Sequence, residues 1–133
     1  MAVDERETQG GVRTASPLPV QRENELSLVK RYVLLGIVTR ILDHDIRIIG
    51  GSGIKFPRFY ETFLRGVQDR VLLDLVHLRG QFRKLGIKVY EEKQETDGMR
   101  ASYVCRGYHH QFLTVWGGIK EEAEQTLKSY LSR

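Results

Sequence analysis

Two long, strongly apolar stretches joined by a glycine-rich link constrain the fold of this chain more than any other feature. They span roughly Asn24–Ile49 and Pro57–Leu85, and the short link Gly50-Gly51-Ser52-Gly53 separates them. Apolar residues recur in them at spacings of three and four, which predicts two helices. Because so short a link places consecutive helices side by side, we expect an antiparallel helical hairpin.

The ends of both helices carry recognisable signals. Asn24 is the predicted N-cap of the first helix, and Pro57 suits the first turn of the second. Gly50 and Gly86 are the expected C-terminal stops. In the first helix, apolar residues wrap most of the circumference, so it must be covered on more than one side. The second cover is either the C-terminal part of the chain or another copy of the chain.

Beyond Gly86 the period changes to that of strands. The Asp97-Gly98 pair is a turn signal between two such runs, and Gly117-Gly118 is expected to end a third. The predicted strands are Ile87–Gln94, Arg100–Arg106 and Tyr108–Trp116, followed by an amphipathic helix over Ile119–Leu131. The predicted fold class is therefore α+β: a long antiparallel helical hairpin, a small antiparallel sheet and a C-terminal helix.

Composition indicates a disordered N-terminal tail over residues 1–22 and a single α+β domain over residues 23–133. The tail is polar and aperiodic, without the apolar core of a signal peptide. Lys30, Arg31 and Arg40 interrupt the most apolar helix, which argues against a membrane span. Cys105 is the only cysteine, so no disulfide can form within the chain. We expect a reducing, cytoplasmic setting and no membrane partner.

Several short segments resemble a bacterial protein family. They are Ile41-Leu42-Asp43-His44-Asp45, Lys88-Val89-Tyr90-Glu91-Glu92, Arg106-Gly107-Tyr108 and Leu127-Lys128-Ser129-Tyr130-Leu131. They are similar to small Bacillus-type proteins, the YhjD-like group, over about Glu25–Leu131. The group has no established activity, so the resemblance implies a bacterial source and assigns no functional residues.

The residues that might carry chemistry do not form a known motif. In Asp43-His44-Asp45, consecutive positions on a helix point in different directions, which favours a solvated helix end over a metal site. Asp74, His77 and His110 have suitable ligand types, but nothing in the sequence brings them together. Cys105 is expected to be an inert, packed thiol. We therefore expect no catalytic residue, no metal site and no cofactor, and an enzyme with a non-local histidine and carboxylate site stays the third alternative.

Asp74 lies at the edge of the apolar arc of the second helix, where a carboxylate is costly unless it has a partner. In an antiparallel hairpin, position 74 lies opposite residues 30–32. We therefore expect a structural polar clamp in which Lys30, Arg31 or the Tyr32 hydroxyl holds Asp74.

Four arginines fall within one sector of the second helix, which Glu61 and Asp69 share. At 100° per residue, Arg58, Arg65, Arg79 and Arg83 form a stripe that could contact phosphates or could simply be the solvated face of a core helix. The net charge of +4 permits a nucleic-acid partner without requiring one.

The sequence thus favours a non-enzymatic interaction or regulatory protein that self-associates, as a homo-oligomer such as a dimer, through its apolar helices. A nucleic-acid-binding regulator that uses the arginine stripe is the alternative.

Overall fold

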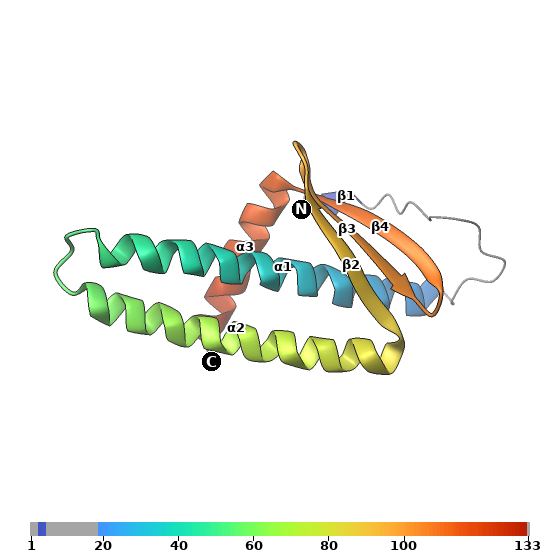
Figure 1. The fold of residues 1–133 in the computed structure, drawn as a ribbon, viewed down its shortest axis with the longest axis horizontal. Coiled ribbons are helices and arrows are strands. Elements are labelled where there is room, and N and C mark those ends of the chain that lie inside the picture. The colour runs from blue at the N-terminus through green and yellow to red at the C-terminus, as the bar shows by residue number, and fades with distance from the viewer. Residues whose placement is uncertain (1–2, 5–18, 133) are drawn as a thin grey trace.

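The computed structural model describes residues 3–4 and 19–132, with side-chain surroundings from residue 23 onward. Its elements are, in chain order, β1 (Val3–Asp4), α1 (Pro19–Gly50), α2 (Pro57–Leu85), β2 (Ile87–Gln94), β3 (Gly98–Cys105), β4 (Tyr108–Val115) and α3 (Trp116–Leu131). The predicted α+β fold class is confirmed: two long helices precede an antiparallel sheet and a final helix (Figure 1).

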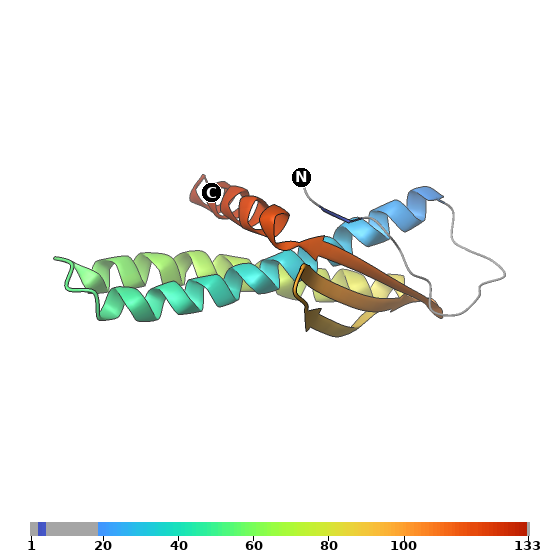
Figure 2. The ribbon, with the colours of Figure 1, turned by 90° about the horizontal axis from the view of Figure 1, so that it is seen from above.

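The two long helices form the expected hairpin, and they lie side by side in both views (Figures 1 and 2). Helix α1 has 32 residues and begins at Pro19, so the prediction that Asn24 is its N-cap is wrong. Proline at a helix start costs nothing, because the N–H it lacks would have no helical partner there. Helix α2 ends as predicted: Gly86 adopts the left-handed conformation (φ 72°), and its N–H donates to the carbonyl of Phe82.

The tail predicted over residues 1–22 falls largely outside the described residues. Its described parts are Val3–Asp4, which pair with Thr114 and Leu113 of β4, and the first turn of α1 from Pro19 onward. The helical hairpin therefore begins four residues earlier than the predicted domain boundary at residue 23.

The sheet has the strand order β1-β4-β3-β2, and all its pairs are antiparallel. Gly98 opens β3 directly against β4, where a Cβ would lie 2.0 Å from the carbonyl oxygen of Thr114, so only glycine fits. The third predicted strand ends one residue early, because Trp116 already begins α3. The expectation that Gly117-Gly118 separates strand from helix is therefore wrong, since both glycines lie in the first turn of α3.

The core consists of two clusters that share α1. The first joins the N-terminal half of α1 to the end of α2 and to the sheet; it contains Val29, Val33, Phe82, Ile87, Tyr103 and Phe112. The second joins the C-terminal half of α1 to α2 and α3; it contains Leu35, Leu42, Val71, Leu75, Ala123 and Tyr130. The sheet and α3 thus supply the second cover that α1 requires, and α3 crosses the hairpin (Figure 1).

Candidate functional site

Three helices meet at the carboxylate of Asp74. The Tyr130 hydroxyl of α3 donates to Asp74 Oδ2 at 2.5 Å, and Arg31 Nη2 of α1 lies 3.6 Å from the same oxygen. Tyr130 is fully buried, and a buried tyrosine hydroxyl needs a polar partner. Asp74 therefore links α2 to both of its helical neighbours.

Among the three partners considered for Asp74, Arg31 lies at ion-pair distance from it. The Tyr32 ring packs on Phe82, with 5.2 Å between ring centroids, and Lys30 Nζ lies 5.9 Å from the centroid of the Phe112 ring. Tyr130 was not predicted as a partner of Asp74. Its position on the apolar side of an amphipathic helix does indicate a buried tyrosine, whose hydroxyl needs a polar partner.

A second polar contact joins the hairpin nearer its turn. Gln68, largely buried on α2, donates through Nε2 to Asp43 Oδ1 at 2.8 Å and to the carbonyl of Thr39 at 3.1 Å. Asp45 instead lies beside the exposed ring of His44, with 3.0 Å between Oδ1 and Nδ1. The two carboxylates that flank His44 therefore have different partners, because consecutive helical positions point in different directions.

The other histidines are widely distributed. His77 is exposed on α2, and His109 Nδ1 lies 3.1 Å from the Tyr90 hydroxyl at the sheet surface. His110 is buried and stacks on Tyr103 at 5.1 Å. Within the part of the chain that the structure describes, no three His, Cys, Asp or Glu side chains form a group that could hold a metal ion.

Cys105 lies in a buried corner that also holds a charged pair. Glu25 Oε2 is 2.7 Å from Arg106 Nη1, and the Glu25 side chain is almost completely buried. Burial, reinforced by the neighbouring Glu25 carboxylate, raises the pKa of the Cys105 thiol to about 12. This corner stabilises the junction of α1 with the β3–β4 turn, and a thiol with so high a pKa is a poor nucleophile.

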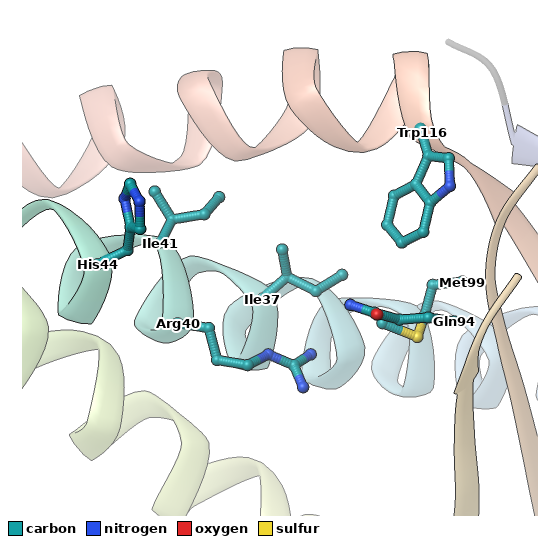
Figure 3. Close-up of a pocket in the computed structure, with 7 residues that line it drawn as sticks. All are labelled: Ile37, Arg40, Ile41, His44, Gln94, Met99 and Trp116. Atoms are coloured by element: carbon teal, nitrogen blue, oxygen red, sulfur yellow. The ribbon is translucent and has the colours of Figure 1, made fainter. Parts of the chain in front are cut away.

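A small open cleft of about 270 Å³ lies between α1, α3 and the ends of β2 and β3. Seven residues line it (Figure 3): Ile37, Arg40, Ile41, His44, Gln94, Met99 and Trp116. One of them, Trp116, is held in place by its Nε1, which donates to the carbonyl of Glu95 at 3.0 Å. Its walls are mainly apolar, and Arg40 and His44 lie along one helix face.

The four arginines of the predicted stripe, Arg58, Arg65, Arg79 and Arg83, are all exposed on α2. The Arg79 guanidinium also lies 5.8 Å from the centroid of the Tyr32 ring. Leu72 and Val76 lie in the same sector and are exposed as well, so apolar surface interrupts the stripe. This interruption is the feature of α2 that the sequence analysis did not use.

These features define a small α+β protein built on a helical hairpin, with polar clamps between its helices. The family model described as "YhjD protein" matches residues 20–133, and the chain belongs to that family. Neither a curated protein nor a solved structure matches the chain. In the described residues, no helix has the combination of length and apolar character needed to cross a membrane.

Replacing Tyr130 by Phe should lower the free energy of unfolding by about 1.5–3 kcal/mol, because it removes a hydrogen bond to a charged group. Chemical denaturation measures this loss. Tyr60→Phe is the matched control, because Tyr60 is exposed; its change should stay within about 0.5 kcal/mol. Equal stability of Tyr130→Phe and the wild type would mean that the hydrogen bond from Tyr130 to Asp74 does not stabilise the fold.

Native Cys105 should react roughly 1,000-fold more slowly with a thiol reagent at pH 8 than a cysteine of ordinary pKa 9.0, because a pKa of about 12 leaves little thiolate. A colorimetric thiol assay with and without denaturant measures the ratio.

The same shift has a stability consequence. A raised pKa favours the neutral thiol in the folded state, so this stabilisation is complete below pH 9.0 and is lost as the pH rises toward about 12. Between pH 9.0 and about 12, the free energy of unfolding of Cys105→Ala should therefore fall less than that of the wild type. A rapid native reaction at pH 8 would contradict both expectations.

Proposed function

We propose that the protein is a non-enzymatic interaction protein that self-associates through the outward face of α2. The observation that carries the proposal is the exposure of Leu72, Leu73 and Val76, at 44%, 55% and 55%, in the middle of a well-packed helix. Clustered exposed apolar side chains on a small protein are typical of an interaction surface. A reducing cytoplasmic setting belongs to the same proposal.

The outward face has the spacing of a helix-pairing surface. Steps of four and three residues along α2 connect its members, which we call the outer seam: Arg58, Thr62, Arg65, Asp69, Leu72, Val76, Arg79 and Arg83. This alternation is the heptad spacing that keeps side chains on one side of a helix facing a partner helix. Only the centre of the outer seam is apolar, so any contact through it is short.

An antiparallel pairing of two copies suits the charges of the outer seam. With the symmetry axis at the level of Asp74, Leu72 lies beside the partner's Val76, and Asp69 lies beside the partner's Arg79. Two opposite-charge pairs then flank two apolar contacts, as a twofold interface requires. Arg65 approaches the partner's Arg83 only at the solvent-exposed ends, where salt screens their repulsion.

Helix α1 is a poorer candidate for this surface. A second copy was one possible cover for its apolar circumference, but the sheet, α2 and α3 already bury Val29, Leu35 and Val38 completely. From residue 23 onward, the large apolar side chains left exposed along the helical hairpin lie on α2 and around the turn.

Exchanging Leu72 and Val76 together for serine should convert a dimer into a monomer, because it removes the apolar centre of the outer seam. Light-scattering chromatography at tens of micromolar protein measures the mass. Leu131→Ser is the matched control, because Leu131 is an exposed apolar residue on α3. The mass of this variant should equal that of the wild type.

The charged pair gives a stricter version of the same test. Asp69→Arg alone should weaken the dimer by about 10-fold or more through like-charge contact with Arg79, and adding Arg79→Asp should restore it. A wild type that is monomeric, or a double variant as weak as the single one, would refute this arrangement.

A nucleic-acid-binding regulator is the second candidate, and the exposure of all four stripe arginines on one side of α2 supports it. We expect any such binding to weaken steeply between low and high salt, with each lost phosphate contact reducing the log–log slope by about 0.7–0.9. Fluorescence anisotropy with single-stranded and duplex oligonucleotides measures it.

Charge reversal at Arg65, Arg79 and Arg83 should abolish that binding, whereas reversal at Lys88, Lys93 and Lys120, which lie on the sheet and α3, should not. Equal effects of the two triple variants would indicate that nucleic acid is attracted by the net positive charge of the protein and not by the arginine stripe. Absorbance at 260 nm in the purified protein distinguishes bound nucleic acid from a clean dimer.

A further inference from the structure

The turn of the helical hairpin carries an exposed apolar surface that neither the core nor the outer seam uses. We call residues 46–60 the hairpin tip. It lies at the end of the hairpin farthest from the sheet, and both views show it clear of α3 (Figures 1 and 2). Phe56 and Phe59 are 69% and 66% exposed, and Ile48, Ile54 and Tyr60 also face solvent. So many large exposed apolar side chains on one projection need a partner.

The charge of the hairpin tip has one sign. Its ionisable groups that are charged at neutral pH are Arg47, Lys55 and Arg58, all exposed, and residues 46–60 contain no aspartate or glutamate. Two carboxylates adjoin these residues: Asp45 is exposed and lies beside His44, whereas Glu61 is partly buried with its Oε1 beside Gly50. The hairpin tip therefore presents cations among aromatic and aliphatic side chains.

Two carbonyls at the end of α1 have partners within the turn. The N–H of Gly51 donates to the carbonyl of Ile48 at 3.1 Å, and both the N–H and the hydroxyl of Ser52 donate to the carbonyl of Ile49. For these two carbonyls, the cost of entering a less polar medium is lower, because backbone groups without partners are expensive there.

We infer that the hairpin tip docks on an anionic lipid surface, with its aromatic and aliphatic side chains among the acyl chains and its three cations at the headgroups. Interfacial protein segments combine apolar side chains with lysine and arginine in this way and enter only the outer part of a bilayer. Such contact is peripheral and requires no helix that spans the membrane.

Two features favour a lipid surface over a second copy of the chain. Two hairpin tips that met head to head would bring three cations against three cations, which opposes association. The hairpin tip is also a convex projection, which a fluid lipid surface accommodates without a matching concave partner. The hairpin tip shares only Arg58 with the outer seam, whose exposed apolar residues lie more than ten positions farther along α2.

Co-flotation with vesicles tests the inference directly, using the full-length chain. We expect binding to vesicles of phosphatidylglycerol mixed with phosphatidylcholine, and at least about 10-fold weaker binding to phosphatidylcholine alone. Lys55→Glu with Arg58→Glu should weaken binding to the anionic vesicles by about 10-fold or more, and so should Phe56→Ser with Phe59→Ser. Circular dichroism and thermal unfolding check that each variant is folded.

Matched controls change the same chemistry elsewhere. Lys88→Glu with Lys120→Glu alters the net charge equally, and Leu131→Ser removes another exposed apolar side chain; both should bind within about twofold of the wild type. As a second measurement, Phe59→Trp should show tryptophan emission shifted to the blue on adding anionic vesicles, relative to the wild type with its single Trp116.

Three results would overturn the inference: no binding to anionic vesicles, equal binding to neutral ones, or equal loss in the control variants. A fall in molecular mass for Phe56→Ser with Phe59→Ser, without vesicle binding by the wild type, would instead identify the hairpin tip as a protein–protein surface. Monomeric wild-type protein that still binds anionic vesicles would refute the outer-seam dimer and leave this inference standing.

Discussion

The burial of α1 is the constraint on which the rest of the structure depends. Its N-terminal half supplies Val29 and Val33 to the core beneath the sheet, and its C-terminal half supplies Leu35 and Leu42 to the core beneath α3. Because apolar side chains surround it, α1 requires neighbours on several sides, and the sheet, α2 and α3 occupy them. Helix α2 needs only one buried face, so its other face and the turn are left to solvent. The surfaces available for partners therefore follow from how completely α1 is enclosed.

The sequence predicted those parts of the fold that depend on local signals. Gly86 ends α2 because a left-handed residue is needed there, and Asp97-Gly98 marks the turn before β3. Prediction failed where a distant contact decides the conformation. Trp116 starts a helix next to two glycines because its N–H donates to the carbonyl of Asp97 and its indole to the carbonyl of Glu95, about twenty residues away. No local pattern around Trp116 reports those bonds.

The candidate polar site shows the same division. The antiparallel register of a hairpin is enough to place residues 30–32 opposite Asp74, and Arg31 is found there. Tyr130 could be recognised as a buried residue of an amphipathic helix, but its partner depends on how α3 crosses the hairpin. The pair Glu25 and Arg106 is a similar case, since it joins residues eighty-one positions apart. A carboxylate near the start of a helix is common, so the sequence around Glu25 does not show that Arg106 will be its partner.

The outer seam and the hairpin tip are both apolar, but their charges suit different partners. The outer seam holds Asp69 as well as arginines, so in the proposed pairing a second copy places an arginine, Arg79, beside Asp69. The hairpin tip holds cations alone, so a second copy repels it and an anionic surface attracts it. The two proposals also constrain each other geometrically. An antiparallel pair of α2 helices would carry its two hairpin tips at opposite ends, so one flat lipid surface could engage only one of them. A dimer of this form would therefore gain little affinity from its second tip on one vesicle, and its avidity would appear only where two lipid surfaces face each other.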